Sequence, residues 1–154
     1  MPHFSKSIRV PYTGEQAFDL VSDIRAYPDF IKWITAMRVS DEVREADGGF
    51  TCIGDAVVGF KGFVERFSTR VVGAPQAGKV TASLVKGPFR KLKAEWRISS
   101  VDRGGTDIAL DIDYDFKNPF IGMLAAANHD LAVNKILAAF LEEASRRYGK
   151  AAPF

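Results

Sequence analysis

Cysteine and histidine are scarce in this chain. Cys52 is the only cysteine, which excludes an internal disulfide and is ordinary for a protein of a reducing compartment. The two histidines, His3 and His129, belong to no recognisable Ser/His/Asp or Cys/His arrangement, and no Cys or His cluster has metal-ligand spacing. We therefore expect no catalytic residue, no metal site and no cofactor, and we predict that the protein is not an enzyme.

Signals for export, membrane insertion and DNA binding are also missing. The first ten residues carry polar and basic side chains among the apolar ones, so they lack the apolar core of a signal peptide. The most apolar stretch, 120–141, is interrupted by polar and charged residues that a bilayer-spanning helix would not carry across its middle. The net charge of +2 does not point to DNA. We expect a cytoplasmic protein, with peripheral contact at the inner face of the membrane left open.

Aromatic residues, by contrast, are plentiful. The chain of 154 residues contains 12 Phe, more than a minimal core needs, and aromatic surface is what commonly lines apolar pockets. The length suits one core, so we treat 1–154 as a single ligand-binding domain.

The start of the chain predicts one strand and two helical pieces. Apolar and polar residues alternate over 4–10, which indicates a short strand. Thr13 and Gln16 form a capping box that begins a helix, and Pro28 should end that helix because its ring disfavours the α conformation one residue earlier. A short second turn or helix should follow at 29–33.

The middle of the chain predicts six strands, because the pattern has period two from about 36 to 116. Five turn signals interrupt it, at 45–49, 59–62, 73–78, 86–90 and 102–105. These connections are too short for parallel crossovers, so the strands should form an antiparallel meander. Asn118-Pro119 and Tyr148-Gly149 then bound a last helix of nearly thirty residues.

Acidic residues alternate along the sixth of these strands. A three-residue turn at Arg103–Gly105 would place Arg97 opposite Asp111 and Lys93 opposite Asp115, which is cross-strand pairing of opposite charges. We therefore interpret these carboxylates as a solvated sheet surface and not as a metal site.

Four short aromatic segments carry a family resemblance. They are Tyr27-Pro28-Asp29-Phe30 with Trp33, Gly62-Phe63-Val64-Glu65, Gly87-Pro88-Phe89 with Leu92 and Trp96, and Ala139-Phe140 before Tyr148-Gly149. Together with the order of elements, they resemble the coenzyme Q-binding subfamily of the START-like, or polyketide cyclase, superfamily. The resemblance implies an α+β helix-grip fold of order β-α-α-β6-α, in which a curved antiparallel sheet of about seven strands wraps around the long C-terminal helix.

The same resemblance implies a function and two alternatives. It implies a non-catalytic carrier or chaperone that binds ubiquinone (coenzyme Q) or a related prenyl lipid and supports respiratory electron transport. Relatives also include a ribosome-association toxin, so a regulator of ribosomal subunit association remains open, and the basic residues Lys86, Arg90, Lys91, Lys93 and Arg97 suit that reading. A cyclase acting on a poly-ketone is the third reading.

The expected ligand-binding residues lie on the inner face of the sheet and on the apolar stripe of the last helix. They are Trp33, Phe63, Glu65, Phe67, Trp96, Tyr114, Leu124, Ala127, Leu131 and Phe140. Glu65 is the one acid in this set. It is included because it occupies an inward-facing strand position, like Phe63 and Phe67. Burial would raise its pKa and let it donate to a ligand carbonyl, whereas a bulge or register shift would turn it to solvent.

Turn parity predicts the mouth of the cavity. In a meander alternate turns lie at the same end, so the turns 59–62 and 86–90, the entrance to the first meander strand and the start of the last helix should meet on one rim. We expect the rim to contain Phe30, Phe60, Lys61, Phe89, Arg90 and Phe120. Such a rim would suit an anionic membrane surface, although the aromatics could equally plug the end of the core.

Overall fold

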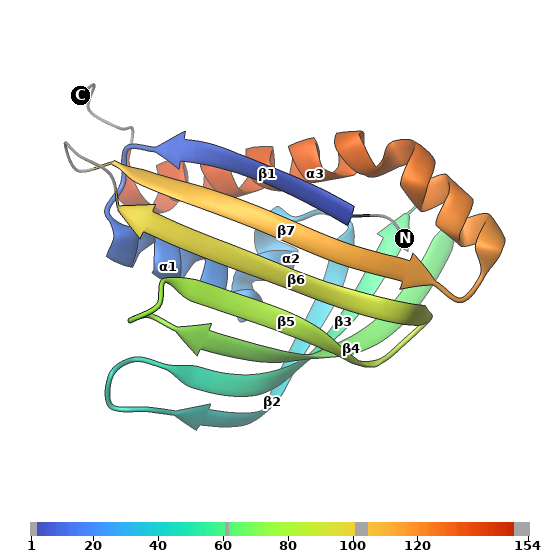
Figure 1. Cartoon of the computed structure of the whole chain (residues 1–154), viewed down its shortest axis with the longest axis horizontal. Coiled ribbons are helices and arrows are strands. Elements are labelled where there is room, and N and C mark those ends of the chain that lie inside the picture. Colours follow the sequence, from blue (N-terminus) through green and yellow to red (C-terminus); the bar gives the residue numbers. More distant parts are fainter. Residues whose placement is uncertain (1–2, 61, 101–104, 150–154) are drawn as a thin grey trace.

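The computed structural model describes residues 3–60, 62–100 and 105–149, without the side chains of Phe60, Phe63 and His129. One curved sheet of seven strands carries the long helix across its inner face, with the shorter helices beside it (Figure 1). The elements are β1 (His3–Val10), α1 (Gly14–Ser22), the 3-10 turn η1 (Ile24–Ala26), α2 (Tyr27–Phe30), β2 (Ile34–Arg44), β3 (Phe50–Phe60), β4 (Phe63–Ala74), β5 (Lys79–Lys86), β6 (Phe89–Ser100), β7 (Thr106–Phe116) and α3 (Pro119–Tyr148).

The sheet confirms the predicted antiparallel meander. Its strand order is β1-β7-β6-β5-β4-β3-β2, so each strand from β2 to β7 lies beside its neighbour in sequence. The first strand joins the far side of the last one, with Phe4 opposite Ile112. The predicted helix-grip fold and its order of elements are therefore confirmed.

Capping chemistry sets the helix ends. Thr13 and Gln16 form the expected capping box at the start of α1. The predicted end of that helix at Pro28 was wrong, because Asp23 leaves the helical conformation (φ −83°, ψ 67°) and Pro28 lies in the first turn of α2, where its missing N–H does no harm. Asn118 Oδ1 accepts the Phe120 N–H at 2.9 Å and so caps α3 as predicted.

The predicted register of β6 and β7 was wrong by two residues. Ser100 pairs with Thr106, so the connection is longer than three residues, and Lys91 rather than Lys93 lies opposite Asp115. The turn itself falls largely on residues 101–104, outside the described residues. Arg97 still forms an ion pair with Asp111, but along a diagonal of the sheet. Asp113 and Asp115 lie opposite Lys93 and Lys91, whereas Asp111 lies opposite Glu95 and meets Arg97 only along that diagonal.

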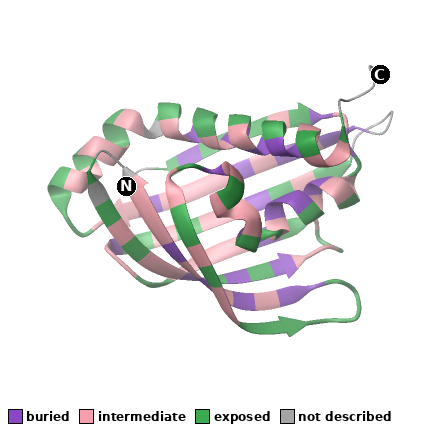
Figure 2. Ribbon diagram, turned by 180° about the vertical axis from the view of Figure 1, so that it is seen from behind, coloured by how far each residue is buried: buried purple, intermediate pink, exposed green. Residues whose placement is uncertain are grey.

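The core lies between the sheet and the C-terminal half of α3. The buried residues of this helix all follow position 132, as the purple turns in Figure 2 show. Phe140 meets the Trp96 ring at 4.8 Å between centroids, in an edge-to-face contact. Near the end of the helix the buried Glu143 accepts hydrogen bonds from Arg146 and Arg147, at 2.6 to 2.8 Å. Arg147 also forms an ion pair with Asp23 at 3.1 Å, and the Tyr148 hydroxyl donates to the Gln16 carbonyl at 3.0 Å, so this end of α3 is attached to α1 and the residue that follows it.

Candidate functional site: an apolar cavity and an adjoining groove

An apolar cavity of about 280 Å³ lies inside the fold, between the sheet, α2 and the second half of α3. Small-molecule sites commonly have volumes from about 300 to 1,000 Å³, so this one has room for a ring or a short chain segment. Its walls include five aromatic residues, Tyr27, Trp33, Phe67, Trp96 and Phe140. The protein's two tryptophans thus both face the same space.

Carbon atoms form nearly the whole lining. Its polar residues are Tyr27, Thr69 and Thr81, and the Tyr27 hydroxyl donates to the carbonyl of Val21. Burial raises the pKa of Tyr27, so this phenol stays neutral. Among the described residues, no acidic or basic side chain lines the cavity. The cavity can therefore exclude water from an apolar group, and it presents no acid or base to act on one.

The structure brings only part of the predicted set to this cavity. Trp33, Phe67, Trp96 and Phe140 line it as expected, and their contact with a ligand stays a prediction. Phe63 lies in β4, but its side chain is outside the described residues.

Glu65 and Tyr114 lie near the cavity but do not line it. Glu65 is half-buried on β4, opposite the cavity residue Val58. Tyr114 is buried next to Leu92, and its hydroxyl has no hydrogen-bond partner within the part of the chain that the structure describes. Burial raises the pKa of this phenol as well.

The prediction for the first half of α3 was wrong. Leu124 is only half-buried and does not line the cavity, Ala127 is exposed, and Leu131 is 55% exposed. The reason is helix phase: the face that meets the sheet is set by Val133, Leu137 and Phe140, and it does not continue along the earlier apolar stripe. Leu131 instead borders a separate outer groove between α2 and α3.

Several lining residues were missed from the sequence. The missed positions with small side chains are Ala56, Ala82 and Ala94, each on a different strand. An alanine at an inward strand position leaves space in front of the sheet, so the alternation pattern contained a usable signal. Met37 and Val58 complete the wall on β2 and β3.

The rim predicted from turn parity exists. The Lys117 N–H donates to the Pro88 carbonyl at 2.9 Å, which joins the start of α3 to the β5–β6 turn. The Gly59 N–H donates to the Trp33 carbonyl at 2.8 Å, which joins the entrance of β2 to the β3–β4 turn. Connectivity alone therefore located this end of the molecule correctly.

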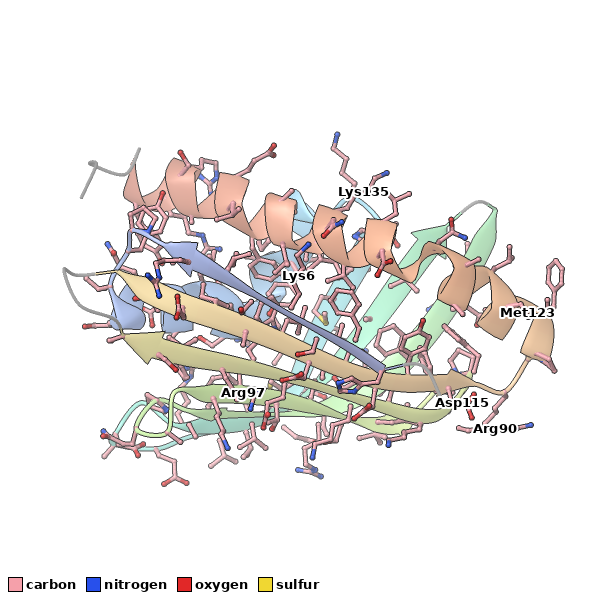
Figure 3. All side chains as sticks on the ribbon, turned by 45° about the horizontal axis from the view of Figure 1, so that its top comes forward. Lys6, Arg90, Arg97, Asp115, Met123 and Lys135 are labelled. Carbon is pink, nitrogen blue, oxygen red and sulfur yellow. The ribbon has the colours of Figure 1, made fainter. Side chains whose placement is uncertain are left out.

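The predicted rim side chains differ in their exposure to solvent. Phe120 is 62% exposed and Arg90 is exposed. Figure 3 shows Arg90 and Met123 at the same end of the molecule, pointing away from the sheet. Phe30 is half-buried, 5.1 Å from the Phe140 ring between centroids, and so belongs to the core periphery. Lys61 lies outside the described residues, as does the side chain of Phe60.

The prediction that Phe89 is an exposed tip was wrong. Only 8% of Phe89 is exposed, and its ring lies 5.5 Å from Phe67 and 4.4 Å from Phe116 between centroids. The sequence did not indicate this burial, because it does not show that β4 and β5 separate beside Phe89. β5 pairs with β4 only up to Ser68, so the ring of Phe89 has room to turn inward against Phe67.

An open groove of about 860 Å³ lies where β4 separates from β5. Residues Phe63–Phe67 of β4 pair with β3 but not with β5, so this stretch of β4 has a free edge. Residues from β2, β3, β4, the end of β5, the β5–β6 turn and the start of β6 line the groove, together with Lys117 between β7 and α3. Phe67 and Phe89 lie at its inner side.

The described residues contain no group of three His, Cys, Asp or Glu side chains arranged to hold a metal ion. None of the helices in this part of the chain is long and apolar enough to cross a membrane.

Comparison with known proteins gives a family match and full-length relatives. Residues 10–141 match the family described as polyketide cyclase / dehydrase and lipid transport. The ribosome association toxin RatA of Pseudomonas aeruginosa is 29% identical, over 96% of this chain and 98% of its own length. The mitochondrial coenzyme Q-binding protein coq10 of Schizosaccharomyces pombe is 28% identical, over 90% of this chain and 84% of its own.

Solved structures agree with the fold. An 18 kDa protein from Caulobacter crescentus is 34% identical, with a TM-score of 0.81 over 97% of this chain and 100% of that one. The Zhui aromatase/cyclase from Streptomyces is 19% identical, with a TM-score of 0.78 over 99% of both chains, which shows a shared fold alone.

Proposed function

Since the chain belongs to the polyketide cyclase / dehydrase and lipid transport family, we propose that it is a non-catalytic carrier or chaperone for a hydrophobic ligand, ubiquinone or a related prenyl lipid. The observation that carries this proposal is the cavity lined almost wholly by carbon. One relative is named a coenzyme Q-binding protein. A carrier of ubiquinone would support respiratory electron transport.

The size of the cavity suggests how such a ligand would bind. A space of about 280 Å³ can take one ring or the first part of an apolar chain, but not a long prenyl lipid as a whole. The remainder would leave the cavity along one of the openings beside it. Burial of the ring against Trp33, Trp96 and Phe140 supplies apolar contact, worth about 25 cal/mol for each Å² removed from water.

Organic extraction of the purified protein followed by mass spectrometry tests this function, and a bound quinone or prenyl lipid is the expected result. Titration with ubiquinone should also change the emission of Trp33 and Trp96, because both face the cavity. Ala94→Phe fills the cavity and should abolish that change. Ala127→Phe, at an exposed position of α3, should leave it intact. Repeated extraction of no lipid, together with no response to quinone, would refute the proposal.

Contact with an anionic membrane surface is part of the same proposal. Phe120 and Met123 are 62% and 72% exposed, Arg90 lies at the same end of the molecule (Figure 3), and the exposed Lys117 is hydrogen-bonded through its backbone to the neighbouring Pro88. Exposed aromatic and basic side chains together favour an anionic lipid surface. Phe120→Ala should reduce sedimentation with anionic liposomes, and unchanged sedimentation would argue against this contact.

Association with ribosomes is a second candidate, because a full-length relative is named a ribosome association toxin. The charge pattern favours it less than the sequence suggested. Lys91 lies opposite Asp115, Lys93 lies opposite an aspartate of β7, and Arg97 is paired with Asp111. Salt-sensitive co-sedimentation with ribosomal subunits would support this reading, since phosphate contacts weaken as salt rises.

A cyclase activity is the third candidate. It rests on the description of the matched family and on likeness of fold, although Glu65 does not line the cavity. It would require turnover of a poly-ketone that is lost in Glu65→Gln.

A further inference from the structure

The groove beside β4 differs from the cavity in its charge. Four cationic side chains, Arg38, Arg66, Lys86 and Lys117, line it, against the single acid Asp55. Asp55 lies opposite Arg38 across β2 and β3 and accepts a hydrogen bond from the hydroxyl of Ser68, so the lining keeps an excess of positive charge. On β6, by contrast, Lys91 and Lys93 lie opposite aspartates of β7, and Arg97 forms an ion pair with Asp111.

The four cations of the groove are not paired. Within the described residues none of them forms an ion pair, whereas Arg9, Arg25 and Arg97 each contact a carboxylate. A concave surface lined by charges of one sign concentrates the field and attracts the opposite charge. Arginine in particular matches carboxylate and phosphate oxygens with two parallel donors. The groove therefore has the chemistry of an anion site.

The groove also adjoins the cavity. Met37, Ala56 and Phe67 lie side by side in register across β2, β3 and β4, and all three line both spaces. The two spaces are thus separated by a single layer of side chains. In that layer Phe67 is the aromatic side chain, and it meets Phe89 edge-to-face at the opening between β4 and β5. A chain that passes between the groove and the cavity would therefore run beside Phe67.

We propose that this groove is a head-group subsite for an amphiphile with a carboxylate or phosphate, whose apolar chain enters the cavity past Phe67. This inference rests on the proposed function, since it assumes a ligand chain in the cavity. It predicts that, beside a neutral prenyl lipid such as ubiquinone, the protein binds chains with an anionic end, and binds them more tightly. A neutral quinone would use the cavity and gain nothing from the four cations.

Binding of three probes with the same chain tests the proposal: dodecyl phosphate, dodecanoate and dodecanol, each below its micelle concentration. The emission of Trp33 and Trp96 reports occupancy of the cavity. At low salt at least one of the anions should bind about tenfold or more tightly than dodecanol, as expected for charge-assisted contacts, and the preference should shrink as salt screens it. Inorganic phosphate alone should compete poorly, whereas strong competition would show a site for free anions and overturn the assignment to a head group.

The double variant Arg38→Gln, Arg66→Gln should reduce the preference for anions to about threefold or less, with binding of dodecanol unchanged. Arg70→Gln is the matched control, because Arg70 is exposed on the same strand and lies outside the groove. Equal binding of all three probes to the parent protein, or an unaltered preference in the double variant, would overturn the subsite while leaving the cavity function intact. No response to any probe or to ubiquinone would instead refute the proposed function itself.

Discussion

Replacement of Phe89 by alanine gives the sharpest test of the packing at the open end of the sheet. The side chain is 8% exposed and lies between the rings of Phe67 and Phe116. Truncation of a buried Phe to Ala commonly costs about 3–5 kcal/mol, through lost burial and the cavity left behind. The adjoining groove lets neighbouring side chains relax into the space, so we expect a value near the lower end, about 3 kcal/mol.

Chemical denaturation measures this cost directly. The midpoint should fall without a change in slope, since the same surface is exposed on unfolding. The melting temperature should fall by about 6–12 °C, because about 1 kcal/mol corresponds to 2–4 °C in a domain of this size.

Phe120→Ala is the matched control for this prediction. It removes the same ring at the same end of the molecule, but Phe120 is 62% exposed and its helix start is held by the side chain of Asn118. We expect a change within about 0.5 kcal/mol, as for other surface positions. Equal stability of the two variants, or a larger loss in Phe120→Ala, would show that Phe89 does not pack as described.

Three further predictions concern stability. Hydrogen bonds from Arg146 and Arg147 lower the pKa of Glu143 from 4.5 to about 2. The stability that these bonds provide is therefore present above pH 4.5 and should be lost as pH falls toward 2. Glu143→Gln should flatten this part of the curve of unfolding free energy against pH. Gly78→Ala should lower the free energy of unfolding, measured in urea, by more than about 1 kcal/mol, because φ is +64° and the new Cβ would lie 2.4 Å from the Ile98 carbonyl oxygen. The control Gly62→Ala should cost less, because its Cβ would meet no atom within 4 Å. Thr13→Ala removes a capping box and should cost about 1 kcal/mol by the same assay, and no measurable loss would contradict the capping role.

Local chemistry made most of the fold predictable. Glycine and proline turns marked the strand ends, and period-two alternation gave the meander, because both signals act within a few residues. The capping residues Thr13 and Asn118 likewise fixed helix starts without help from distant parts of the chain. Turn parity then followed from connectivity alone, which explains why the rim was found while some of its side chains were misjudged.

The errors arose where distant contacts decide. The register of β6 and β7 depends on the length of a connection, and a two-residue difference moved every cross-strand partner. The sequence of α3 contains many alanines spread around the helix, so several of its faces are apolar. Packing of Phe140 against Trp96 decides which face meets the sheet. The burial of Phe89 depends on the shift between Ser68 and Thr69, where β4 leaves β5. No residue near Phe89 in sequence signals that opening.

The pairing of the first strand with the last one affects how this protein can be made. Phe4 of β1 pairs with Ile112 of β7, so during synthesis β1 has no strand to pair with until most of the chain has left the ribosome. Contacts between such distant positions slow folding, because a long loop must close before they contribute. The nascent chain meanwhile exposes an unpaired strand, which is the kind of segment that aggregates or recruits chaperones. A circular permutant that begins at β2 and places β1 after α3 would shorten this delay without changing the final sheet, because only α3 would then separate β7 from β1 in sequence.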